Sequence, residues 1–587
     1  MHVARFWANI GQARFLAELA LERSEGLGMI VKTARYLRPE QVVARAAFVA
    51  ERKLARLRPG ILERHIVRKM PAILATTRDA EPLWRWPPGP LDPASRTRPG
   101  LVDDILNGQF TFLNDSRQVE NWWPEGASRL WLFHLHGFSW AIDLAVAARR
   151  GRADAATALQ RGVDDWLKHH PVSDSDAWHP YVVSERLMAW LTVRDLLPEL
   201  NSAVREPILE HAAFLDHHLE HDVAGNHLLK NLVALLLAGC AYDGPYPTAW
   251  RTRAARHLET ELQRQVLRDG GHYERSPMYH LLVLADLLAA LWASGRRELP
   301  VSVTLADAVR RMQSVARGLV HPDGEIPLFN DSVLGEAPSP AKLIGPSTTS
   351  APDILPSTGY AKLPVAEGVL IADCGPPGPD DLPAHVHADA LSFELSLGEE
   401  RVFVDGGVFD YVASALRTRL RGTAAHNTVQ IDGRDQSEVW SAFRVGQRAR
   451  VRLVHAAPGT LVAEHDGYAR VGVRHERRID AFADRGWRIL DTLVGTGEHI
   501  ADARLRLHPA LQFRVGVGEW LVCDDEDRVL LAVRPIGGPD PELESGVYAE
   551  RFGQLQDVEV LRLRRTGPLP LVFGCWLLLP GAEPTPG

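Results

Sequence analysis

The chain changes its hydrophobic periodicity near residue 350, and this change constrains the fold more than any other feature of the sequence. Upstream, apolar residues recur at helical spacing between short polar breaks. Downstream, apolar and polar residues alternate, which is typical of half-buried strands. We expect helices over 154–169, 184–197, 203–219, 227–239 and 277–294. We expect strands over 391–397, 402–405, 428–431, 449–454, 470–474, 488–493, 529–533 and 558–564. A block of helices followed by a block of strands predicts separate domains instead of one α/β sheet.

The length of 587 residues also favours more than one domain. A stretch rich in Pro, Ser and Thr over 336–359 predicts a linker, because such a composition packs no core. Many short strands with regular turns predict a sandwich or barrel after it. We therefore expect four segments: an N-terminal helical arm over 1–110, a helical domain over 111–345, a linker over 346–358 and a β-domain over 359–587.

The charge balance excludes some partners. Lys plus Arg number 66 against 74 Asp plus Glu, giving a net charge of −8, so we expect neither nucleic acid nor an anionic membrane as a partner. The apolar runs 232–242 and 281–293 are too short to predict a membrane span. The first apolar stretch is broken by Gln12, Arg14 and Glu18, which predicts no secretory signal and a cytoplasmic location for the sequence as written. The four cysteines are widely spaced and predict core thiols.

Two candidate sites begin predicted helices. Asn226 and His227 precede an apolar helical run, and there Asn226 has two interpretations: a helix cap or a functional amide. The second site contains Glu274, Ser276, Pro277 and Tyr279. Ser276 is a natural N-cap and Pro277 a natural first residue, which predicts that Tyr279 lies in the first turn. A phenol there can donate a proton, or accept one if a positive field lowers its pKa; simple packing is the alternative.

A third cluster combines His385, His387, Asp405 and His426. In an extended segment, His385 and His387 project to the same face. His387, Asp405 and His426 form a mixed nitrogen and oxygen set that suits zinc. The alternative is a group of surface histidines with an aspartate in a turn.

The sequence resembles the heparinase II/III-like family, which is related to several alginate and oligoalginate lyases. The blocks that carry the resemblance run in the family's order from about residue 30 to 445. In the helical part they are Arg129–His136, Trp178–Arg186, Asn226–Asn231, Asp269–His280 and Pro327–Asp331. In the β part they are His385–Phe393 and Arg421–Thr428.

The resemblance implies an incomplete (α/α) toroid followed by an antiparallel β-sandwich, with the active site between the domains. It also implies a polysaccharide lyase, which abstracts the C5 proton of a uronic acid and expels the oxygen linked at C4. Asn226, helped by His385, would bind the uronate carboxylate. Tyr279 would be the main acid/base and His227 its counterpart.

Further roles follow from the same resemblance. Arg186 and Glu274 would contact the substrate or orient other residues. His387, Asp405 and His426 would hold one structural divalent metal, most often zinc, and no organic cofactor is implied. The best-known family members are periplasmic. Runs of Lys or Arg are absent from the sequence, which favours a low-sulfated or unsulfated anionic polysaccharide, such as a bacterial exopolysaccharide or a glycosaminoglycan-like polymer.

Three other functions remain open. A glycoside hydrolase on the same fold would need two carboxylates, for which Asp269, Glu274 and Asp331 are available. A metal-dependent hydrolase would use the predicted metal ligands. A non-catalytic glycan-binding or assembly factor in exopolysaccharide metabolism would keep the binding groups without turnover.

Overall fold

The computed structural model describes residues 32–33, 35–57, 60–82, 100–173, 175–345 and 351–584. The stretch examined for a secretory signal and residues 346–350 of the predicted linker lie outside the described residues. The described part divides into two compact units. The first contains Leu37–Gln265 and Val283–Val309; the second contains Val266–Leu282, Arg310–Gly587 and the short segment Ile30–Tyr36. These units do not follow chain order, and the four predicted segments stay a prediction.

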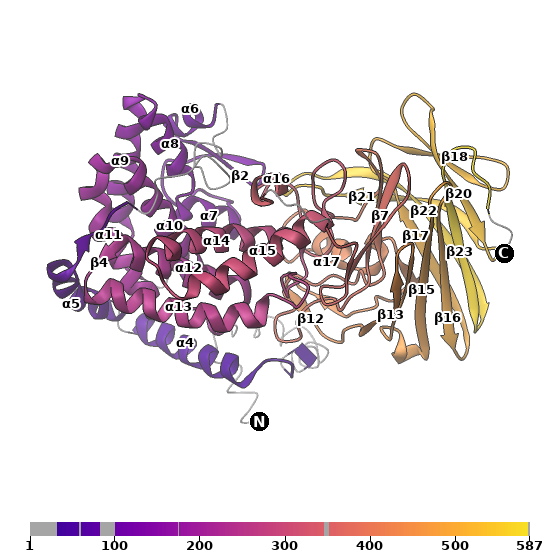
Figure 1. Cartoon of the computed structure of the whole chain (residues 1–587), viewed down its shortest axis with the longest axis horizontal. Helices are drawn as coiled ribbons and strands as arrows, with labels where there is room; N and C mark the ends of the chain where they lie inside the picture. The colour runs from indigo at the N-terminus through magenta and orange to yellow at the C-terminus, as the bar shows by residue number, and fades with distance from the viewer. Residues whose placement is uncertain are drawn as a thin grey trace. The chain divides into compact units, whose positions relative to one another are not determined.

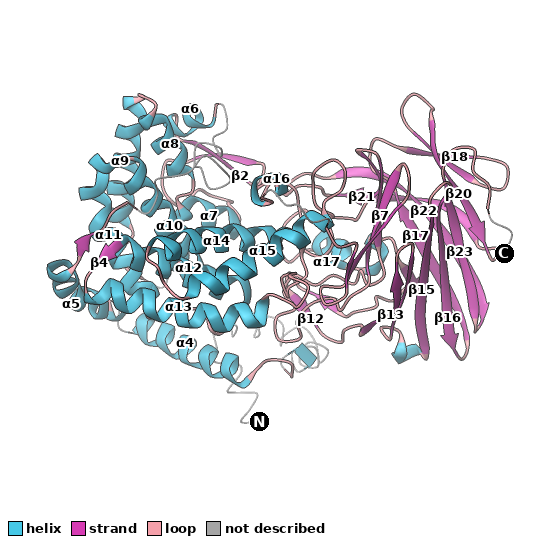
Figure 2. Cartoon of the chain, viewed as in Figure 1, coloured by secondary structure: helices cyan, strands magenta, loops and turns pink. Residues whose placement is uncertain are grey.

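The first unit is built from helices (Figure 2). These are α4 (Pro39–Leu57), α5 (Ile61–Thr76), α6 (Leu101–Leu106), α7 (Arg129–Gly137), α8 (Trp140–Arg149), α9 (Ala153–His169), α10 (Pro180–Leu196), α11 (Asn201–Leu215), α12 (Gly225–Ala241) and α13 (Pro245–Gln265). Short 3₁₀ turns lie at Asp176–Trp178 and Pro198–Leu200. Two small antiparallel pairs join β1 (Arg78–Asp79) to β4 (Tyr242–Asp243) and β2 (Gln109–Phe112) to β3 (Asp115–Gln118).

Helices α10 and α12 form the centre of this unit. They lie beside each other, and most of their residues are buried around the full circumference. A helix that is apolar on all sides needs neighbours on all sides, which explains why the other helices surround this pair. The five predicted helices are confirmed as α9, α10, α11, α12 and α14, within a few residues at their ends.

Helices α14 (Pro277–Arg296) and α15 (Val301–Leu319) each contribute to both units. The first turn of α14 belongs to the second unit, and so does the end of α15. There Val315 and Leu319 pack against Phe329, Tyr360 and Ile371. The stretches Arg129–Arg149 and Pro277–Arg296 are long and apolar enough to cross a membrane by length and composition. More than half of each is buried inside the protein, as in a core helix.

The second unit is rich in antiparallel strands (Figure 1). One sheet has eight strands in the order β13-β14-β15-β16-β23-β20-β19-β18. Their bounds are β13 (Val451–Ala457), β14 (Thr460–His465), β15 (Val473–Phe482), β16 (Gly486–Gly495), β18 (Gln512–Val515), β19 (Trp520–Cys523), β20 (Val529–Ile536) and β23 (Leu571–Leu578).

Two further sheets join through a bridge between Phe403 and Leu507. The four-stranded sheet has the order β10 (Val429–Ile431), β17 (Glu498–Arg506), β22 (Gln556–Pro568) and β21 (Asp540–Tyr548). The five-stranded sheet has the order β5 (Ile354–Leu355), β6 (Tyr360–Pro364), β7 (Gly368–Asp373), β8 (Phe393–Leu397) and β9 (Glu400–Phe403). The short elements that remain are β11 (Val439–Trp440), β12 (Arg444–Val445), α16 (Pro340–Leu343), α17 (Ala415–Arg421) and 3₁₀ turns at Thr423–Ala425 and Ala469–Val471.

One hydrophobic cluster contains buried residues of all three sheets, which makes this unit a sandwich. Seven of the eight predicted strands are confirmed as β8, β9, β10, β13, β16, β20 and β22. The predicted strand 470–474 is mostly wrong, because Ala469–Val471 forms a 3₁₀ turn and β15 begins only at Val473. The predicted linker is not structureless, because α16 and β5 lie within 336–359.

Strand β8 shows how the alternation in the sequence works. Phe393 and Leu395 point into the sandwich core, whereas Glu394, between them, lies on the other face. Glu394 is fully buried and accepts hydrogen bonds from Arg401 (2.9 Å) and from the backbone N–H of Leu328 (2.8 Å). Burying a carboxylate is unfavourable unless it is paired and hydrogen-bonded. Glu394 therefore ties the segment around Leu328 to the sandwich.

Candidate functional site

Asn226 and His227 lie in the first turn of α12, in the first unit. The helix begins at Gly225, and its N-cap is Ala224, which makes no side-chain cap. The capping interpretation of Asn226 is therefore wrong. Ala224 has a φ of +64°, a left-handed conformation that is costly for a residue with a Cβ. Strain of this kind often occurs at functional sites.

His227 pairs with a carboxylate that the sequence analysis did not identify. Its Nδ1 donates to Oε1 of Glu220 at 3.0 Å. Glu220 also accepts a hydrogen bond from the amide of Asn231 (3.0 Å) and is 4% exposed. Burial by itself raises the pKa of Glu220, but His227 and His179 outweigh it and lower that pKa to about 2. An ionised Glu220 fixes the tautomer of His227 and leaves its Nε2 as the proton acceptor.

Arg186 does not reach the surface. It is 0% exposed, and its guanidinium carbon lies 4.0 Å from the ring centre of Trp166. It donates to Nε2 of His211 (2.9 Å) and to the carbonyl oxygen of His136 (2.7 Å). A cation held over aromatic faces away from water contributes about 2 kcal/mol. This placement gives Arg186 no surface for substrate contact, so we assign it a packing role.

Tyr279 and His385 lie together in the second unit. The Ser276 hydroxyl accepts a hydrogen bond from the N–H of Tyr279 at 3.2 Å, so the predicted cap and first-turn position are confirmed. The tyrosine ring stacks on the His385 ring, with 3.8 Å between centroids and 26° between planes. The hydroxyl of Tyr279 lies 3.2 Å from that of Tyr411, a residue that the sequence analysis missed.

His385 lies between two buried carboxylates. Its Nδ1 is 3.1 Å from Asp331 and its Nε2 is 3.2 Å from Glu274. Burial by itself lowers the pKa of His385, but hydrogen bonds to Asp331 and Glu274 outweigh it and raise that pKa to about 9. Glu274 is 1% exposed, so it orients His385 instead of meeting a polymer.

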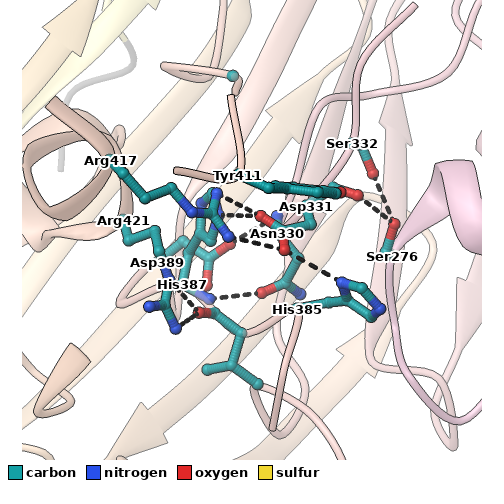
Figure 3. A network of polar contacts seen from close by, with 12 residues as sticks. Ser276, Asn330, Asp331, Ser332, His385, His387, Asp389, Tyr411, Arg417 and Arg421 are labelled. Atoms are coloured by element: carbon teal, nitrogen blue, oxygen red, sulfur yellow. Dashed lines mark hydrogen bonds and ion pairs between the residues drawn. The ribbon is translucent and has the colours of Figure 1, made fainter. Parts of the chain in front are cut away.

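Asp331 connects this group to the rest of the site (Figure 3). Besides His385, its carboxylate accepts hydrogen bonds from Nε2 of His387 (2.9 Å) and from Arg417 (2.8 Å). Burial favours a raised pKa for Asp331, but Arg417 and the two histidines hold that pKa well below its usual range. The guanidinium of Arg417 also lies 5.0 Å from the ring centre of Tyr411.

The predicted metal ligands come together. One donor atom each from His387, Asp405 and His426 lie within 4.8 Å of one another, and all three residues are buried. Nδ1 of His387 and Nε2 of His426 have no hydrogen-bond partner within the described part of the chain. Nearby, the Asp389 carboxylate interacts electrostatically with both His426 and Asp405, and its Oδ1 is also buried without a partner. Such an arrangement of nitrogen and oxygen donors fits a divalent cation.

The carboxylates considered for a hydrolase are already engaged. Asp269 accepts hydrogen bonds from the N–H of Ser357 and from the N–H and hydroxyl of Thr358, all within 2.8 Å. Asp331 and Glu274 bind the histidines described above. A glycosidase pair needs an acid that holds a proton and a base open to water. These contacts argue against that assignment.

Comparison with protein families gives two matches. Residues 104–344 match the model described as heparinase II/III N-terminus. Residues 347–570 match the model described as heparinase II/III-like, C-terminal. Together the two matches cover more than half of the chain.

Individual relatives are distant. The chain is 28% identical to FtsZ-localized protein C of Caulobacter vibrioides, over 68% of this chain and 70% of the relative. It is 22% identical to a heparin-sulfate lyase of Bacteroides stercoris, over 70% and 71% of the two chains. The crystal structure of heparinase III superposes with a TM-score of 0.70 at 18% identity, covering 89% of this chain and 92% of the other. This likeness confirms the predicted fold, a helical toroid followed by an antiparallel β-sandwich.

Replacing Glu220 by Gln should reduce stability in a pH-dependent way. The pKa of Glu220 falls from 4.5 to about 2 on folding, so its charge stabilises the protein above pH 4.5. That contribution is lost as the pH falls from 4.5 towards 2. Urea unfolding at several pH values should show a deficit in Glu220→Gln at neutral pH that shrinks on acidification. Glu206→Gln, at an exposed position, serves as control. A loss of stability in Glu220→Gln that does not vary with pH would contradict the proposed pairing of Glu220 with His227.

Asp331→Asn should lower the free energy of unfolding by about 3–5 kcal/mol, because Arg417 would remain buried without its anion. Asp527→Asn is the matched control, since Asp527 forms an exposed pair with Arg514. The control should change stability by less than about 0.5 kcal/mol. Urea denaturation of both variants measures the difference. Equal stabilities would show that Asp331 does not hold this cluster together.

Proposed function

The chain belongs to the heparinase II/III-like family, and from this membership we propose that it is a polysaccharide lyase acting by β-elimination on a uronic-acid-containing glycan. The observation that carries the proposal is the stacked pair of Tyr279 and His385, with Tyr411, Glu274 and Asp331 around it. A phenol against a histidine held between two carboxylates is a suitable arrangement for proton transfer.

β-Elimination requires three contributions from the protein: neutralisation of the uronate carboxylate, a base for the C5 proton and an acid for the leaving oxygen. For the first, we propose the amide of Asn226 and the imidazole of His385. The hydrogen bonds of His385 to Asp331 and Glu274 hold its ring in place. Preorganised donors of this kind stabilise a developing enolate, with about 2.7–4 kcal/mol from a single donor in a well-studied case.

For the proton transfers, we propose Tyr279 as the main acid/base and His227 as its counterpart. The hydrogen bond of Nδ1 of His227 to Glu220 leaves Nε2 as the atom that can accept a proton. The hydroxyl of Tyr411, 3.2 Å from that of Tyr279, is placed to exchange a proton with it. Glu274 and Asp331 act by orienting His385.

We further propose that His387, Asp405 and His426 hold one structural divalent cation, most suitably zinc. The metal would supply positive charge to a buried group of carboxylates and fix the segment that carries His385. The two buried nitrogens without partners, Nδ1 of His387 and Nε2 of His426, support this proposal. No step of the elimination is assigned to the metal.

For the substrate, we propose an anionic polysaccharide of low or no sulfation. The support is the net charge of −8 and the absence of Lys or Arg runs. A highly sulfated chain needs many cationic contacts, and the charge balance of this protein does not favour them.

A second candidate function is a non-catalytic glycan-binding or assembly factor. The relative with 28% identity favours it, because the name FtsZ-localized protein C states a location and no reaction. The two candidates share the binding groups and differ in turnover, so the same variants distinguish them.

Tyr279→Phe should reduce kcat by about 10²–10⁴-fold while the affinity for polymer is retained, because it removes only the transferred proton. The assay follows the ultraviolet absorbance of the unsaturated uronate on heparosan, heparan sulfate, hyaluronan, alginate and glucuronan. Tyr246→Phe, on α13, is the matched control.

Three results would contradict the lyase proposal. New reducing ends without the unsaturated product would indicate a hydrolase. Binding without any cleavage, together with full biological activity of Tyr279→Phe, would indicate the assembly factor. Equal elimination by Tyr279→Phe and the parent protein would exclude Tyr279 as the acid/base.

The purified protein should contain about one zinc per chain. His426→Ala should lose the metal and melt at a lower temperature, whereas the exposed His455→Ala should keep both properties. Metal content by mass spectrometry and thermal unfolding with and without a chelator measure this. A chelator that abolishes turnover without lowering the melting temperature would instead support a metal-dependent hydrolase.

A further inference from the structure

A pocket of about 710 Å³, open to solvent, lies beside α17 in the second unit. Its volume falls within the range of about 300–1,000 Å³ that is common for small-molecule sites. Ser414, Thr418, Arg419, Asp435 and Ser441 are among its lining residues. They carry three hydroxyls, a guanidinium and a carboxylate, which together suit a ligand rich in hydroxyl groups. We call this cavity the α17 pocket.

Three arginines lie in or behind the pocket wall, against one lining carboxylate, that of Asp435. Arg419 is exposed and makes no ion pair within the part of the chain that the structure describes. Behind the lining residue Ala424, the buried Arg506 donates to the carbonyl oxygen of Ala424 at 3.2 Å. Behind Ser441, Arg421 donates to the carbonyl oxygen of Ser441 at 3.0 Å. The hydrogen bonds of Arg506 and Arg421 go to carbonyls. Asp405 and Asp331 interact electrostatically with these arginines but do not line the pocket, so the charges on the pocket's side still favour an anion.

One wall of the pocket is fixed in a strained conformation. Ser441 has a φ of +52°, in the left-handed region. Arg421 holds its carbonyl, and Arg417 donates to the carbonyl of the next residue, Ala442, at 3.1 Å. Such strain persists only where surrounding contacts enforce it. A preformed wall reduces the entropy lost when a ligand binds.

The same helix connects the pocket to the proposed reaction site. Its buried face carries Arg417, which binds Asp331, and Arg421, which donates to the carbonyl of Val386 at 2.9 Å (Figure 3). Val386 lies between His385 and His387 in sequence. Its exposed face carries Thr418 and Arg419, which line the pocket. One short helix therefore contributes to both sites.

We propose that the α17 pocket binds a uronate residue of the polysaccharide other than the one that is cleaved. The carboxylate of that sugar would lie against Arg419, and its hydroxyls would bond to Ser414, Thr418, Ser441 and Asp435. The ligand class rests on the proposed function; the pocket itself rests on the cavity and its charges.

The test uses the full chain with Tyr279→Phe, which should slow cleavage enough for binding to be measured alone. Isothermal titration calorimetry measures binding of unsulfated oligosaccharides from heparosan, hyaluronan and alginate. For an oligosaccharide that the parent binds, adding Arg419→Ala should raise the Kd by about tenfold, because a charge-assisted contact is lost. Ala415→Trp, which fills the pocket from an exposed position, should weaken it as well. Arg450→Ala, an exposed arginine outside the pocket, should bind like the parent.

Kinetics with Tyr279 intact separate this proposal from the lyase proposal. Arg419→Ala should raise KM and leave kcat unchanged, since the contact is the same in ground and transition states. If the protein eliminates and both pocket variants keep the KM and affinity of the parent, the pocket proposal is wrong and the lyase proposal stands. If the parent binds an oligosaccharide but cleaves none, and both pocket variants lose this binding, the lyase proposal is wrong and the pocket proposal stands. If the parent binds none of the three oligosaccharides, the pocket proposal is wrong.

Discussion

The buried carboxylate of Asp331 is the interaction on which the second unit's site depends. It compensates the charge of Arg417 and accepts hydrogen bonds from His385 and His387, so a single anion sets the position of three other side chains. Burying these charges is unfavourable unless all of them are paired. The group is therefore assembled completely or not at all, which suits a site that must position a proton donor accurately.

The β-sandwich provides the rigid support for this group. The segment with Asp331 is attached to β8 through Glu394, and its neighbour Asn330 donates its backbone N–H to Asp389 at 3.0 Å. The amide of Asn330 in turn accepts a hydrogen bond from the N–H of His387 at 2.9 Å. Polar contacts on the outer face of a packed sheet thus fix loops that would otherwise be free to move. The well-packed hydrophobic core therefore fixes the positions of the site residues.

The sequence predicted the fold class and many of the elements because helical and strand periodicities are local signals. It missed long ones too, among them α13, α15, β17 and β21. It did not predict the partners of the site residues. Tyr411 and Glu220 lie in no recognisable motif. Only folding brings Tyr411 to Tyr279 and Glu220 to His227. For Arg186, its place in a family block suggested substrate contact or orientation of other residues, and its aromatic, buried surroundings argue against the first of these. Burial of a charged side chain depends on tertiary packing, which a local pattern does not contain. Similarly, Asn226 had two local interpretations, and the observed helix start excludes the cap, whereas the functional amide stays a prediction.

The division of α14 between the two units has a consequence for how such a protein diversifies. Tyr279 is encoded within the helical half of the sequence, yet it folds with His385 as part of the second unit. Asn226, His227 and Glu220 form a separate set within the first unit. A crossover at the boundary between the helical and β halves of the sequence would separate Tyr279 from His385. A chimera that keeps Tyr279 with His385 would need its crossover upstream of Tyr279, before Val266, so the group that is inherited together does not coincide with either half of the sequence.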